Sequence, residues 1–119
     1  MLREESSDSV TTISIDRSEL LVRLRECVSS MARDTAAVVA VRLLGSLARN
    51  SECGTSDVDL LVLLNETPVD RVEWIRRLLG YFDLPVGVDL LVYGAREFEE
   101  GIETGNVAFR RMWGESKPL

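Results

Sequence analysis

Apolar positions along the chain follow two different spacings, which separate predicted helices from predicted strands. In residues 18–34 the apolar side chains fall three or four positions apart, a spacing that places them on one side of a helix. They are Leu20, Leu21, Leu24, Val28 and Met31. Asp16, with Glu19 three residues later, resembles the capping box that begins many helices. We therefore predict a helix over residues 18–34.

A second helix is predicted to begin at Thr67-Pro68, where a cap residue is followed by proline at the first helical position. It is predicted to end at Gly80, because glycine is common immediately after the last helical residue. The residues that this helix is expected to bury are Val72, Ile75 and Leu79.

Short apolar runs rich in valine and leucine predict strands between the helices. These runs are residues 37–44, 57–64 and 86–93. After them, the segment from Ala95 to about Trp113 predicts one or two short helices, broken near Gly101 and Gly105. Because strands alternate with helices, the fold class is predicted to be α/β.

The length of 119 residues fits one small domain, and 45% of the residues are apolar, which is enough for one core. No apolar run approaches the roughly 18 residues of a membrane span, so no membrane association is expected. Residues 1–15, rich in serine, threonine and acidic residues, are predicted to be a disordered lead-in rather than a secretory signal. Residues 16–114 would form the domain, and 115–119 a C-terminal tail.

Two cysteines, Cys27 and Cys53, lie far apart and form no metal-binding or redox spacing. We interpret both as reduced thiols of a cytoplasmic protein, because disulfides are rare in that compartment.

The chain has no histidine, which excludes Ser-His-Asp and Cys-His nucleophile systems and histidine metal sites. Catalysis would therefore depend on carboxylates, hydroxyls, arginine and a hard metal ion. The net charge is −6 and Lys117 is the only lysine. Proteins that bind nucleic acid usually carry a basic patch, so direct nucleic-acid binding is not expected.

Three aspartates in or beside apolar strands are the candidate catalytic residues. Asp57 and Asp59 are two positions apart on a predicted strand, so their side chains point to the same side. Two close anions repel unless a cation lies between them, and Mg²⁺ is a hard ion that prefers such oxygen ligands. Asp89 lies inside a third apolar run, where an ionised carboxylate is costly unless it is paired or bound to metal. The alternative for Asp89 is a hydrogen-bonded aspartate at the rim of the strand.

Gly45-Ser46 follows the first predicted strand. Glycine there allows close approach of the backbone to a ligand, and a serine hydroxyl with exposed N–H groups can bind phosphate oxygens. A phosphate-binding turn beside metal-binding carboxylates predicts chemistry at phosphorus. Two metal ions in such a site can stabilise both the attacking and the leaving oxygen of an in-line displacement.

Gly45-Ser46, ten further residues and then Asp57-Val58-Asp59 resemble the signature of minimal nucleotidyltransferases of the DNA polymerase β-like superfamily. The resemblance covers the chain from about Leu20 to Trp113 and includes Asp89 as the third carboxylate. It implies a small mixed β-sheet flanked by helices. It also implies transfer of a nucleoside monophosphate with release of pyrophosphate.

The resemblance assigns roles to individual residues. The nucleotide triphosphate, ATP, would be bound by Gly45, Ser46, Arg49 and Ser56. Two Mg²⁺ ions would be bound by the catalytic residues Asp57, Asp59 and Asp89, and Asp89 would help to activate the attacking hydroxyl.

The stretch GSLARN departs from the GSxARG that many relatives of this kind carry, often with arginine directly after the serine. Leu47 stands in place of that arginine, Arg49 is kept, and Asn50 stands in place of the last glycine. The loss of a cation near the phosphates would weaken nucleotide binding or change its geometry.

Stand-alone minimal nucleotidyltransferases are often paired with a helical HEPN-domain protein. The resemblance therefore implies a toxin–antitoxin pair in which the transferase adds AMP to a tyrosine of the HEPN toxin. One alternative is an inactive module that neutralises its partner by steric masking, and another is a small-molecule adenylyltransferase of the antibiotic-modifying type. An edge strand or an exposed helix could also support a homodimer.

Overall fold

The computed structural model describes the backbone of residues 2–7, 10–15 and 17, and describes residues 18–44 and 58–119 with their side chains. The predicted site residues Gly45, Ser46, Arg49, Ser56 and Asp57 lie outside the described residues.

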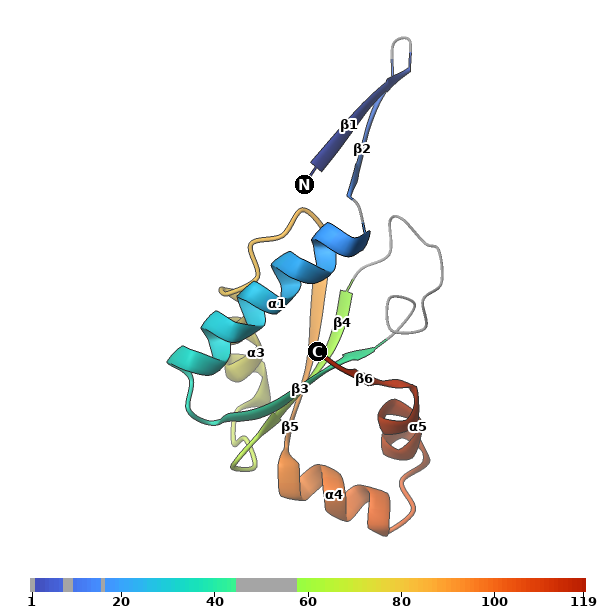
Figure 1. The fold of residues 1–119 in the computed structure, drawn as a ribbon. Helices are drawn as coiled ribbons and strands as arrows, with labels where there is room; N and C mark the ends of the chain where they lie inside the picture. Colours follow the sequence, from blue (N-terminus) through green and yellow to red (C-terminus); the bar gives the residue numbers. More distant parts are fainter. Residues whose placement is uncertain (1, 8–9, 16, 45–57) are drawn as a thin grey trace.

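A four-stranded mixed sheet forms the centre of the molecule, with strand order β5-β4-β3-β6 (Figure 1). The strands are β3 (Val38–Leu44), β4 (Val58–Leu64), β5 (Val88–Gly94) and β6 (Lys117–Pro118). β4 and β5 are parallel, whereas β3 is antiparallel to both β4 and β6. The predicted α/β class with a small mixed sheet is confirmed, and β6 adds a short edge strand that the sequence analysis placed in the tail.

Alternation along β4 gives the sheet two apolar faces, each covered by different helices. The first face packs against α1 (Arg17–Asp34) and α3 (Arg71–Leu79). Its buried residues include Leu20, Leu24, Met31, Leu78, Val58, Leu60, Val62 and Leu64. The second face packs against α4 (Ala95–Glu103) and α5 (Val107–Glu115) through Leu61, Leu63 and Phe98. Because its side chains are buried on both faces, β4 is almost continuously apolar.

The helix predicted over residues 18–34 is confirmed as α1. The five apolar residues at helical spacing are buried or half-buried, and Leu24 and Met31 are fully enclosed. Asp16 lies outside the described residues, so its capping role stays a prediction.

The predicted start of the next helix was wrong. α3 begins at Arg71, and Asp70 is its N-cap, because the Asp70 carboxylate accepts a hydrogen bond from the backbone N–H of Glu73 at 3.1 Å. Val72 is 74% exposed rather than buried, and Leu78 is the residue that α3 buries fully. The predicted end at Gly80 is confirmed.

The C-terminal segment forms two short helices, as predicted. Gly105, with φ of +92°, lies in the turn between them, where a left-handed backbone favours glycine. Gly101 does not break a helix as predicted: it lies within α4, where the absence of a side chain admits the ring of Phe109.

Residues predicted to be disordered form an antiparallel pair of strands instead. β1 (Leu2–Ser7) and β2 (Val10–Ile15) make a sheet of their own beyond the N-terminal end of α1 (Figure 1). The β2 sequence VTTISI is rich in β-branched residues, which favour extended backbone. The prediction of disorder used the serine, threonine and acidic content of residues 1–15 and did not use the preference of β-branched residues for extended backbone.

Cys27 lies half-buried on α1 and carries a free thiol, as predicted. Burial raises the pKa of this thiol, and the backbone of Asp83 and the charge of Arg23 offset only part of that effect. The thiol therefore stays protonated near neutral pH and is a poor nucleophile. Cys53 lies outside the described residues.

Across the part of the chain that the structure describes, we find no helix with the length and apolar character needed to cross a membrane.

Gly94 joins β5 to α4, and its substitution tests how tightly this junction packs. A Cβ at Gly94 would lie 2.8 Å from the Cα of Thr67 and 2.9 Å from the carbonyl oxygen of Glu66. Because both contacts are backbone atoms, we expect Gly94→Ala to lower the free energy of unfolding by about 1–3 kcal/mol, measured by urea denaturation. Gly114→Ala is the control, since a Cβ there meets no atom within 4 Å. Equal urea midpoints for Gly94→Ala and the wild type would contradict the close packing.

Candidate functional site

Asp59 on β4 and Asp89 on β5 are directly paired in the register of the two parallel strands. Paired positions of neighbouring strands lie about 4.8 Å apart and present their side chains on the same face. Asp59 is also paired with Leu44, the last residue of β3. The fold therefore brings together two of the three predicted catalytic carboxylates, which are 30 residues apart in the sequence and separated by α3.

The two carboxylates lie on the second face of the sheet, at the end opposite to α4. Asp59 alternates with Leu61 and Leu63, which belong to the cluster beneath α4 and α5. α4 begins where β5 ends, so it covers the far end of this face. At the opposite end, which carries the carboxylates, Asp89 is exposed and Leu91 is 37% exposed. A ligand can therefore reach the carboxylates from this end.

The expectation that Asp89 lies in a buried environment was wrong. Its apolar neighbours Leu90 and Val92 are buried in the first face, whereas Asp89 and Leu91 point to the second face near its uncovered end. Asp89 therefore avoids most of the desolvation cost expected for a carboxylate inside an apolar run. Asp59 is half-buried and has an interaction partner.

The remaining predicted site residues belong to the connection between β3 and β4, which the structure does not describe. The described residues on either side of it are Leu44, the last of β3, and Val58, the first of β4. Because Leu44 is paired with Asp59, both attachment points lie at the sheet end that carries the two carboxylates. The predicted roles of Gly45, Ser46, Arg49, Ser56 and Asp57 stay predictions.

The described carboxylates fit a hard divalent cation. Asp59 and Asp89 supply adjacent oxygen donors on one face, and Asp89 is accessible to solvent. Mg²⁺ is commonly bound by one or two carboxylates with the remaining positions taken by water and substrate phosphates. Within residues 18–44 and 58–119, no group of three potential ligands gathers, and Asp57 is not among these residues.

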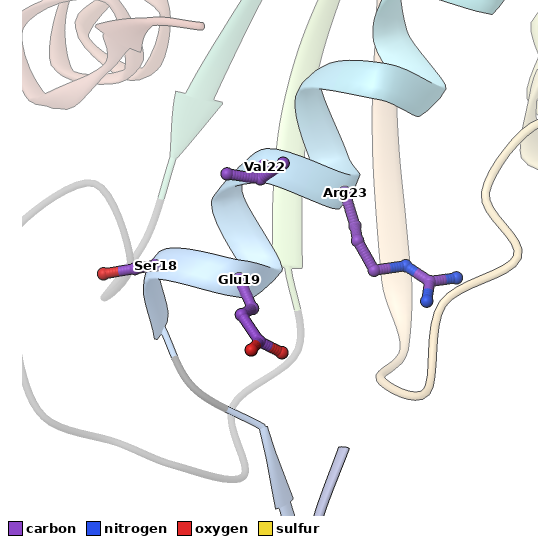
Figure 2. Close-up of a pocket in the computed structure, with 4 residues that line it drawn as sticks. All are labelled: Ser18, Glu19, Val22 and Arg23. Carbon is purple, nitrogen blue, oxygen red and sulfur yellow. The ribbon is translucent and has the colours of Figure 1, made fainter. Parts of the chain in front are cut away.

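A surface depression of about 330 Å³ at the N-terminal end of α1 is separate from the carboxylates. Figure 2 shows its four described lining residues on neighbouring turns of the helix: Ser18, Glu19, Val22 and Arg23. α1 packs on the first face of the sheet, whereas Asp59 and Asp89 lie on the second face. We therefore do not assign this depression to the candidate site.

Arg42 also lies on the second face, and the sequence analysis gave it no role. It precedes Leu44 by two residues on β3, so the two side chains share a face. Its contacts are with Trp113 and Ser116, more than 70 residues further along the chain. No spacing in the sequence points to this arrangement.

Comparison with known proteins identifies the family. Residues 21–116 match the model of the nucleotidyltransferase domain. A solved structure of a proposed minimal nucleotidyltransferase is 31% identical, covers 88% of this chain and 97% of that one, and has a TM-score of 0.58. A proposed nucleotidyltransferase from Sulfolobus solfataricus is similar in fold, with 21% identity, 71% and 75% coverage and a TM-score of 0.60. No protein of curated function matches the chain.

Proposed function

The chain belongs to the nucleotidyltransferase domain family, and on that premise we propose that it transfers AMP from ATP to a hydroxyl group in the presence of Mg²⁺. The observation that carries this proposal is the pairing of Asp59 with Asp89 on an accessible face of the sheet. Neighbouring carboxylates repel each other unless a cation lies between them, so this pair is suited to bind Mg²⁺.

In the proposed reaction, the acceptor oxygen forms a bond to the α-phosphorus of ATP. The bond from that phosphorus to its bridging oxygen breaks, and pyrophosphate leaves with the bonding electrons. Asp89, the more exposed carboxylate, would accept the hydroxyl proton, and Asp59 beside it would hold Mg²⁺. Bound Mg²⁺ would supply stabilisation of the negative charge that develops on the phosphate oxygens.

We further propose that the acceptor is a tyrosine of a HEPN-domain toxin, which makes this chain the antitoxin. The uncovered end of the second face supports this proposal because it gives a protein side chain access to the carboxylates. The net charge of −6 supports it as well, because a ribonuclease partner carries a basic surface for RNA.

The experiment is intact mass spectrometry of a HEPN-type protein encoded beside this chain, after incubation with the chain, ATP and Mg²⁺. We expect the mass of the partner to increase by whole AMP groups. Asp89→Asn should prevent the increase, whereas Asp83→Asn, which changes an exposed aspartate in the loop before β5, should not. An unmodified partner that is nevertheless silenced would refute transfer and favour steric masking. Labelling of an aminoglycoside instead of the protein would favour the small-molecule activity.

A further inference from the structure

Arg42 is a half-buried guanidinium held in a fixed position by the C-terminal segment. Its Nε donates a hydrogen bond to the hydroxyl oxygen of Ser116 at 2.6 Å, and its Nη2 donates to the backbone oxygen of Ser116 at 3.1 Å. Its guanidinium carbon lies 4.1 Å from the centroid of the Trp113 ring. Ser116 is only 7% exposed, so this contact is part of the packed structure.

Arg42 lies on the same face of the sheet as the two carboxylates and is paired with Leu61, two residues after Asp59 on β4. β6 is antiparallel to β3, with Arg42 paired with Pro118 and Leu43 paired with Lys117. Ser116 precedes Lys117, so the Arg42 guanidinium that it binds is directed toward Leu44, which is paired with Asp59. One strand spacing and two residues along the strand, roughly 8 Å, separate the backbone of Arg42 from that of Asp59.

The charge of Arg42 has no carboxylate partner among the described residues. A second half-buried arginine provides the contrast: Arg71 lies 5.0 Å from the centroid of the Tyr93 ring, and two of its hydrogen bonds go to the Glu97 carboxylate at 2.9 and 3.1 Å. Both printed hydrogen bonds of Arg42 go instead to the neutral Ser116. A guanidinium that is fixed, partly desolvated and not neutralised is suited to bind an anion, and phosphate accepts its planar set of donors well.

We propose that Arg42 binds the polyphosphate of the nucleotide, beyond the α-phosphate, and retains it as pyrophosphate when AMP is transferred. This inference rests on the proposed function for the identity of the ligand. A polyphosphate chain that begins at Asp59 and Asp89 carries its further negative charges away from the carboxylates. Arg42 is a described cation that is fixed on the same face, within reach of that chain. Ser116 and Trp113 act as positioning residues, because they orient the guanidinium without contacting the ligand.

The test is isothermal titration calorimetry of the full chain with ATP, inorganic pyrophosphate and AMP as separate ligands, each with Mg²⁺. In Arg42→Gln we expect the affinities for ATP and pyrophosphate to fall by about 10- to 100-fold, because charged hydrogen bonds are lost. The affinity for AMP should stay within about twofold, since AMP lacks the phosphates that Arg42 binds. A merely structural role would weaken all three ligands together.

Arg71→Gln is the matched control, since it removes another half-buried guanidinium that lies over an aromatic ring. It should leave the ratio of ATP to AMP affinity unchanged. If Arg42→Gln does not fold, Arg42→Lys keeps the charge but loses the planar donors, and should still weaken pyrophosphate relative to AMP. Unchanged pyrophosphate affinity in a folded Arg42 variant, or no binding by the wild type, would overturn the proposal. If the affinities for ATP, pyrophosphate and AMP change as expected in Arg42→Gln but the wild type transfers AMP to no acceptor, only the proposed function is refuted.

Discussion

Asp59→Asn should reduce nucleotidyl transfer by at least about a hundredfold and leave the fold intact. Asp59 lies between Leu44 and Asp89 in the strand register, so its carboxylate is at the centre of the candidate site. Asparagine has nearly the same shape but lacks the negative charge that binds a hard cation. The rate is measured as transfer of radiolabelled AMP from ATP at saturating Mg²⁺.

Urea denaturation of the same variant separates the loss of chemistry from a loss of stability. Replacing one of two neighbouring anions removes their mutual repulsion, so the free energy of unfolding should change by no more than about 1 kcal/mol. Asp83→Asn changes an exposed aspartate whose backbone oxygen accepts a hydrogen bond from Arg23 of α1, on the first face, and should retain the wild-type rate. If Asp59→Asn kept more than about a tenth of the wild-type rate, the carboxylate would not be a ligand of the reacting centre.

An element of the fold could be predicted from the sequence where the spacing of apolar residues within that element was sufficient to identify it. The spacing in residues 18–34 sufficed for α1, because the five apolar residues at helical spacing all pack in the same cluster against the sheet. For α3 a local pattern misled us: Thr67-Pro68 is a good start signal, yet Asp70 supplies the side-chain cap. Val72 was wrongly assigned to the core and Leu78 was missed, whereas Ile75 and Leu79 pack partly against the core as predicted.

The site was predictable as a set of residue types but not as an arrangement. Sequence spacing named Asp59 and Asp89, whereas their direct pairing depends on the parallel register of β4 and β5. The exposure of Asp89 depends on which part of a sheet face α4 leaves uncovered, and no local pattern encodes that. Arg42 was missed for the same reason, because Ser116 approaches it only when β6 joins the sheet.

Phe98→Ala should lower the free energy of unfolding by about 3–5 kcal/mol, the largest stability effect that we expect in the second cluster. Phe98 is 1% exposed, and its ring centroid lies 4.8 Å from that of Phe109, 5.9 Å from Tyr93 and 6.1 Å from Trp113. Removing the ring leaves a cavity where α4 and α5 meet the sheet. Urea denaturation followed by tryptophan fluorescence measures the loss, because Trp113 lies against the altered residue.

The size of this loss tests whether the second face of the sheet, which carries the carboxylates, unfolds together with the rest of the domain. Phe98→Leu fills most of the space and should cost clearly less than alanine, whereas Val107→Ala, at a position 75% exposed on α5, should change stability by no more than about 0.5 kcal/mol. A loss below about 1 kcal/mol in Phe98→Ala would mean that α4 and α5 contribute little to folding. In that case Trp113 could not hold Arg42 rigidly, because its support would come from a loosely packed layer. A loss in the expected range would mean that packing in the second cluster stabilises the face that carries the site. The same packing holds Trp113 beside Arg42 and buries Leu61 and Leu63, which follow Asp59 on β4.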